Sequence, residues 1–82
     1  MTDPITIGKQ FIKSLSQAGI PVSAAYLYGS YAKGNAKPYS DIDICIISPS
    51  LGKDMIDEMV KLRQISRKID DRIEALPFGT DD

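Results

Sequence analysis

The chain contains no histidine, and Cys45 is its only cysteine. Without histidine, a serine–histidine catalytic triad and a zinc site with histidine ligands are both excluded. A single cysteine cannot form an intramolecular disulfide. Because Cys45 lies in an apolar run, we expect a buried, unreactive thiol.

Long apolar runs are also absent from the sequence. No stretch approaches the roughly twenty apolar residues that span a bilayer, and the N-terminus lacks the basic start and apolar core of a signal peptide. We therefore expect a cytoplasmic protein with no membrane partner. Ten basic and eleven acidic residues give a net charge of −1, so no long-range attraction favours direct nucleic-acid binding.

The length of 82 residues indicates a single domain over residues 1–82 with a thin core. Apolar spacing alternates between helical and extended patterns in the order α-β-α-β-α-β. The predicted elements cover residues 4–18, 22–28, 30–33, 41–47, 53–67 and 71–76. Helices between strands predict an α/β fold, a small sheet with helices packed on it.

The sequence also predicts details within these elements. The strand at 22–28 is apolar nearly throughout, which is typical of a strand covered on both faces. In the helix at 53–67, Met55, Met59, Leu62 and either Ile65 or Ser66 are expected to face inward. Pro77 is expected to end the last strand.

The most informative motif is a Gly29-Ser30 pair, followed after a gap of ten residues by Asp41 and, two positions later, Asp43. Side chains alternate along a strand, so the two aspartates at the start of the strand at 41–47 should share one face. Adjacent carboxylates repel unless a cation lies between them, and Mg²⁺ binds carboxylates together with substrate phosphates. A Gly-Ser turn offers backbone N–H groups and a hydroxyl to a phosphate. These residues together predict a metal-assisted nucleotide site.

A site of this kind usually has a third carboxylate on a neighbouring element. In the last predicted strand, Ile73 and Ala75 share one face and Glu74 lies on the other. If Ile73 faces the core, Glu74 faces the site. Asp71 is the alternative, because a slip of one residue reverses every side chain of a strand. A plain exposed glutamate is the remaining interpretation of Glu74.

The motif resembles a known family. Residues 29–34, GSYAKG, followed by residues 40–44, SDIDI, resemble the minimal nucleotidyltransferases (MNT) of the DNA polymerase β superfamily. The resemblance covers nearly the whole chain. It implies a nucleotidyltransferase-like mixed sheet, Mg²⁺ and a nucleoside triphosphate.

The resemblance also implies roles for individual residues. Gly29 and Ser30 would hold the triphosphate, and Asp41 and Asp43 would bind the metal. Glu74 would stand where the family places its third catalytic and metal-binding carboxylate.

The chain departs from the family pattern at three points. The third carboxylate of the family is usually an aspartate, whereas Glu74 is longer by one methylene. Lys33 replaces a frequent arginine. The chain stops at Asp82, where family members generally continue into another helix. A C-terminal helix is therefore expected to be missing, either from a fragment or from a shortened member.

Stand-alone domains of this family are similar to antitoxins paired with HEPN-type RNase toxins, to which they can transfer AMP from ATP. The resemblance therefore implies a Mg²⁺-dependent transfer of AMP to a hydroxyl of a partner protein, a HEPN-type toxin. The alternative is a non-catalytic antitoxin, a binding module that neutralises its toxin by complex formation. An aminoglycoside-type nucleotidyltransferase is disfavoured, because those enzymes carry an additional helical domain.

Overall fold

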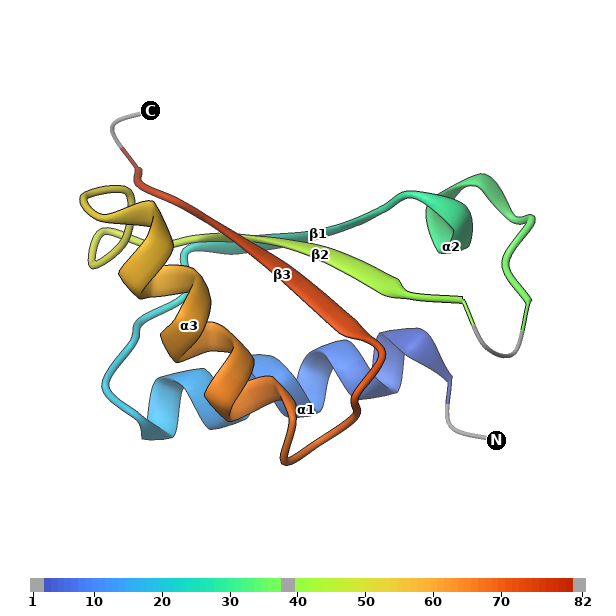
Figure 1. Ribbon diagram of the computed structural model, residues 1–82, viewed down its shortest axis with the longest axis horizontal. Helices are drawn as coiled ribbons and strands as arrows, with labels where there is room; N and C mark the ends of the chain where they lie inside the picture. Colours follow the sequence, from blue (N-terminus) through green and yellow to red (C-terminus); the bar gives the residue numbers. More distant parts are fainter. Residues whose placement is uncertain (1–2, 38–39, 81–82) are drawn as a thin grey trace.

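Six elements follow one another in the predicted order α-β-α-β-α-β (Figure 1). The computed structural model describes residues 3–37 and 40–80, and of Ser30 and Ala32 it describes the backbone alone. The elements are α1 (Pro4–Gln17), β1 (Ala24–Tyr28), α2 (Ser30–Lys33), β2 (Ile42–Ile47), α3 (Met55–Ser66) and β3 (Ile73–Phe78). Among these residues, no helix is both long enough and apolar enough to cross a membrane.

The strands form a mixed sheet in the order β1-β2-β3. β1 runs antiparallel to β2, and β2 runs parallel to β3. A parallel connection needs a crossover, and α3 provides it between β2 and β3. The mixed sheet expected from the family resemblance is therefore confirmed.

The core lies between the sheet and the two long helices. Figure 1 shows α1 and α3 on the same side of the sheet. Ile42, Ile44 and Ile46 of β2 are buried, and they pack in one cluster with Phe11 of α1 and Leu62 of α3. The alternate residues of β2 are only half-buried. The described part of the chain therefore forms two layers, and none of its long helices lies on the opposite face of the sheet.

The prediction that β1 is covered on both faces is wrong. Ala25 and Leu27 pack against the core, whereas Tyr26 is 59% exposed on the opposite face. The strand looks apolar in sequence because a tyrosine ring is largely apolar, yet its hydroxyl is satisfied by water at an open surface. Alternation of tyrosine with smaller apolar residues indicates a half-buried strand.

The predicted inward face of α3 is only partly correct. Leu62 and Ser66 are buried, but Met55 is 50% exposed and Met59 is 39% exposed. Leu51, which lies in the turn before the helix, is buried in the core cluster. The buried residues of α3 thus lie in its C-terminal half, and the methionines of its N-terminal half are at the surface.

β3 extends further than predicted. Pro77 does not end the strand but lies buried inside it, opposite Ile46 of β2. Proline has no N–H to donate, so it is found mainly in edge strands. β3 is at the edge of the described sheet, which accommodates Pro77.

Candidate functional site

Three side chains lie in one row across the sheet. The register pairs Tyr28 of β1 with Asp43 of β2, and Asp43 with Glu74 of β3. Residues paired in register project to the same face. Ile42 and Ile44 are buried against the helices, so Tyr28, Asp43 and Glu74 project from the open face.

This register shows which of the two candidate carboxylates lies in the row with Asp43. Glu74 lies beside Asp43 on the neighbouring strand, as alternation predicted. Asp71 is exposed and precedes β3, so the one-residue slip that would favour it does not occur. The position of Glu74 is therefore confirmed, while its chemical role stays a prediction.

Asp41 lies one residue before β2 and is exposed. Its carboxylate is close enough to Asp43 for its negative charge to raise the pKa of Asp43, in addition to the larger effect of burial. The structure therefore brings the two aspartates together as an interacting acidic pair.

The turn at Gly29 approaches one member of this pair, Asp43, directly. Gly29 has a φ of +73°, which side-chain-bearing residues rarely adopt. A Cβ at this position would overlap Asp43 Oδ2 and lie 3.1 Å from Asp43 Cγ. Glycine is therefore required at position 29 for two reasons: the positive φ of the backbone, and the close approach of this backbone to the Asp43 carboxylate. α2 begins at the next residue, and Lys33 N–H donates to the Gly29 carbonyl at 3.1 Å.

The open face is electrically negative around the row. The pKa of Tyr28 is raised by burial and by the charges of Asp43, Cys45 and Glu74. Cys45 is half-buried on this face, less deeply than predicted, and burial raises the pKa of its thiol. A raised pKa favours the protonated thiol, which is weakly nucleophilic; the unreactive thiol expected from the sequence stays a prediction.

Asp41 and Asp43 are the residues best suited to hold a cation. Their oxygens are hard ligands, and their mutual repulsion would be relieved by a divalent ion. Within residues 3–37 and 40–80, no three histidine, cysteine or acidic side chains converge on one point. The arrangement is therefore an aspartate pair with Glu74 beside it, which fits Mg²⁺, an ion that often binds one or two carboxylates plus phosphates.

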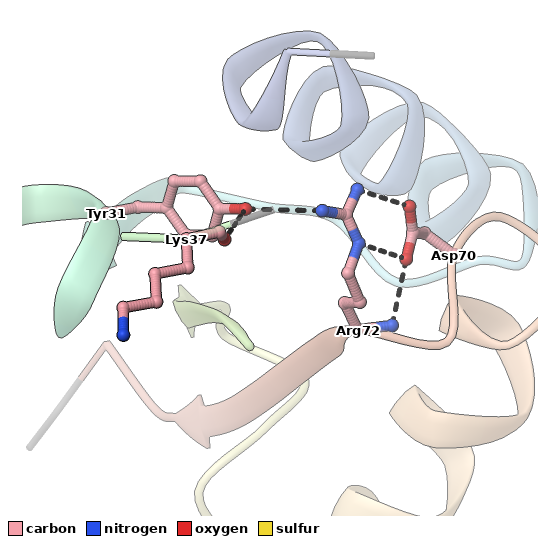
Figure 2. A network of polar contacts seen from close by, with 4 residues as sticks. All are labelled: Tyr31, Lys37, Asp70 and Arg72. Atoms are coloured by element: carbon pink, nitrogen blue, oxygen red, sulfur yellow. Dashed lines mark hydrogen bonds and ion pairs between the residues drawn. The ribbon is translucent and has the colours of Figure 1, made fainter. Parts of the chain in front are cut away.

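A hydrogen-bonded network links α2, which follows the Gly29 turn, to the residues just before β3, the strand that carries Glu74. Figure 2 shows the Arg72 guanidinium between the Tyr31 hydroxyl and the Asp70 carboxylate. Arg72 Nη1 donates to Tyr31 Oη at 3.2 Å, and Nη2 donates to Asp70 Oδ2 at 2.9 Å. The network joins α2 to the residues that precede β3. Sequence reasoning missed it, although Asp70 and Arg72 form an opposite-charge pair two residues apart.

Comparison with known proteins identifies the family. Residues 8–78 match the nucleotidyltransferase domain family. The chain belongs to this nucleotidyltransferase family. The resemblance to minimal nucleotidyltransferases of the DNA polymerase β superfamily is thereby confirmed.

One similar protein is a putative protein adenylyltransferase of Methanocaldococcus jannaschii, 39% identical over 57 residues. The matched segment is 68% of this nucleotidyltransferase chain but only 39% of that relative. The fold is similar to the crystal structure of a putative nucleotidyltransferase from Sulfolobus solfataricus, with a TM-score of 0.69 and 18% identity. That match covers 93% of this chain and 67% of the other, and it confirms the predicted fold class.

Ser30 is the one predicted site residue whose side chain lies outside the described part of this nucleotidyltransferase. Its backbone begins α2, directly after Gly29. The predicted contact of its hydroxyl with a triphosphate stays a prediction.

Replacing Gly29 by alanine should destabilise the domain more than the same change at Gly19. Both glycines have positive φ, but a Cβ at Gly19 would meet no atom within 4 Å. Gly19→Ala should therefore cost only the backbone strain, about 1–2 kcal/mol. Gly29→Ala adds the overlap with Asp43, and we expect a further loss of about 1–3 kcal/mol. Urea denaturation measures both free energies of unfolding.

The overlap can be tested separately in the background of Asp43→Ala. Removing the carboxylate should reduce the cost of Gly29→Ala to that of Gly19→Ala. If Gly29→Ala and Gly19→Ala lowered the free energy of unfolding equally in the wild-type background, the close approach of Gly29 to Asp43 would be contradicted.

Replacing Asp43 by asparagine should slightly stabilise the metal-free nucleotidyltransferase at neutral pH. The folded-state pKa of Asp43 is raised, so its ionisation is less favourable in the folded state than in the unfolded state. The resulting destabilisation is complete above the folded pKa and disappears as the pH falls below the ordinary aspartate range. Asparagine carries no charge, so we expect a gain below about 1 kcal/mol at pH 7.

Thermal melts of both proteins between pH 3 and pH 8, without metal, measure this effect. The two curves should converge in acid. A variant that is less stable than wild type at neutral pH, with the difference disappearing in acid, would show that the pKa of Asp43 is lowered instead.

Proposed function

We propose that this nucleotidyltransferase domain uses Mg²⁺ to transfer the AMP moiety of ATP to a hydroxyl of a partner protein. The observation that carries the proposal is the contact of the Gly29 turn with Asp43, in a row that continues to Glu74. The closeness of Gly29, Asp43 and Glu74 supports a site in which the turn binds phosphate, Asp41 and Asp43 bind the metal, and Glu74 is the third carboxylate. The relative named as a putative protein adenylyltransferase supports the choice of a protein acceptor.

The reaction balances with ATP and one hydroxyl. The hydroxyl oxygen forms a bond to the α-phosphorus, the bond from that phosphorus to the α,β-bridging oxygen breaks, and pyrophosphate leaves. The hydroxyl proton is released. Mg²⁺ held by Asp41 and Asp43, with Glu74 beside it, would neutralise the triphosphate and favour ionisation of the hydroxyl.

The strand order gives the proposed site a direction. The Gly29 turn follows β1, Asp43 lies on the central strand β2, and Glu74 lies on β3. The triphosphate would therefore lie toward β1, and the acceptor hydroxyl would approach from the β3 edge. Glu74 is exposed, which leaves its carboxylate accessible to an entering acceptor. The chain itself would supply position and charge, which are the main contributions to this class of catalysis.

The acceptor that we propose is a tyrosine of a HEPN-type toxin, with this chain as the antitoxin. The test uses purified chain, Mg²⁺ and a candidate HEPN-type protein, with ATP labelled at either the α- or the γ-phosphate. Label from the α-phosphate should appear on the partner protein, label from the γ-phosphate should not, and EDTA should prevent labelling. Transfer of the γ-label would contradict nucleotidyl transfer.

A second candidate function is a binding module that neutralises its toxin without catalysis. The observation that favours it is an open groove of about 380 Å³ between α3 and β3, lined by Ile56, Met59 and Val60 and by Glu74. Ile56 and Val60 are exposed, and exposed apolar patches often mark protein contacts. A stable complex with the HEPN-type protein and no α-label on it would favour this alternative.

A further inference from the structure

Arg72 lies where three parts of the proposed site meet. Its carbonyl accepts a hydrogen bond from Ile42 N–H at 2.7 Å. Ile42 is the residue between Asp41 and Asp43, so this bond fixes the start of β2 against β3. Glu74 follows Arg72 by two residues in the sequence. The backbone of Arg72 therefore connects the aspartate pair to the third carboxylate.

The side chain of Arg72 extends the connection to α2. Its Nη1 donates to Tyr31 Oη at 3.2 Å, and Tyr31 Oη donates to the Lys37 carbonyl at 3.3 Å (Figure 2). Tyr31 is two residues after Gly29, and its ring packs against the core. One phenol thus links the helix that follows the Gly29 turn both to Arg72 and to the loop after α2.

Asp70 fixes the orientation of the guanidinium. Asp70 Oδ1 accepts from both Arg72 N and Nε, at 2.9 and 3.0 Å, and Oδ2 accepts from Nη2 at 2.9 Å. The two side chains are 22% and 21% exposed, so solvent screens the pair only partly. A carboxylate that binds both edges of a guanidinium restrains its plane. The hydrogen bond from Arg72 also lowers the pKa of Asp70.

We propose that Arg72 is a positioning residue, which holds the Gly29 turn at a fixed place relative to Asp43 and Glu74 by way of Tyr31. The contribution of Arg72 to catalysis rests on the proposed function. Arg72 would not touch the reacting atoms. Loosening the turn should weaken binding of the triphosphate in both the ground state and the transition state, which raises KM and leaves kcat nearly unchanged.

Tyr31→Phe is the sharpest variant, because it removes only the hydroxyl and retains the ring in the core. We expect KM for ATP to rise about five- to tenfold and kcat to stay within about twofold. Tyr26→Phe is the matched control, since Tyr26 is exposed on β1 and is not part of the network. Its KM should stay within about twofold of wild type. A fall in kcat at unchanged KM in Tyr31→Phe would overturn the positioning role.

Amide hydrogen exchange tests the same proposal without catalysis. In Tyr31→Phe and in Arg72→Lys, exchange should become at least about fivefold faster in residues 29–34 and stay unchanged at Ile44 in the core. A lysine cannot make the planar contacts to Asp70 and Tyr31 together. Unchanged exchange in residues 29–34 of Tyr31→Phe would overturn the proposal, even if Arg72→Lys unfolds. Inactive wild-type protein whose exchange responds as expected would instead refute the proposed function and retain the positioning role.

Discussion

Replacing Asp43 by asparagine should reduce nucleotidyl transfer by roughly a thousandfold or more, equivalent to about 4 kcal/mol of transition-state stabilisation. Asp43 contacts the Gly29 turn, interacts with the charge of Asp41 and lies beside Glu74. No other described residue combines these three relations. Asparagine has nearly the same shape but no negative charge, so it should bind Mg²⁺ poorly while the fold persists.

The measurement is the initial rate of α-label transfer, with circular dichroism to confirm folding. Asp41→Asn should show a comparable loss. Mg²⁺ with ATP should raise the melting temperature of wild type, because ligands that bind the folded state stabilise it. The same addition should leave the melting temperature of Asp43→Asn almost unchanged. Full activity of either aspartate variant would exclude the proposed mechanism.

Replacing Glu74 by glutamine should reduce Mg²⁺-dependent transfer nearly as far, by roughly a hundredfold to a thousandfold. The expected loss depends on the register that pairs Glu74 with Asp43 across β2 and β3. Glutamine keeps the length and the hydrogen-bonding capacity of the side chain, so the change isolates the charge.

Asp71→Asn is the matched control for Glu74→Gln. Asp71 is also acidic and exposed, three residues earlier in the chain, but it lies before β3 and outside the row. Its activity should stay within about twofold of wild type. The opposite ranking, with Asp71 important and Glu74 dispensable, would remove Glu74 from the site and leave the aspartate pair without its proposed third carboxylate.

Local sequence patterns predicted much of this site. The alternation of Asp41 and Asp43 with buried isoleucines defines both the strand and its exposed face, because each side chain has a strong preference for water or for the core. The same argument placed Glu74 opposite Ile73 and Ala75. Gly29 was predicted from its turn, and the structure adds the physical reason, which is the contact with Asp43.

The remaining features depend on contacts that no local pattern contains. Met55 and Met59 are at the surface because the N-terminal half of α3 is not covered by the core. How much of a helix is covered depends on how it packs in the fold, and local spacing does not contain that information. Pro77 is accommodated because β3 is at an edge, and strand order is a property of the whole sheet. The hydrogen bond between Arg72 and Tyr31 joins residues 41 positions apart, so neither residue indicates the other in sequence.

The central claim is that the open face at Gly29, Asp41 and Asp43 binds Mg²⁺ and a nucleoside triphosphate. A crystal structure of the chain with Mg²⁺ and α,β-methylene-ATP, which cannot release pyrophosphate, tests this claim most directly. We expect a metal ion bound by Asp41 and Asp43 at about 2.0–2.1 Å, with the triphosphate against the Gly29 turn. The C-terminal end of α3 offers a different, basic surface, formed by Arg63 and by Arg67 and Lys68 just after the helix. A triphosphate bound there, with no metal at the aspartates, would contradict the proposed site.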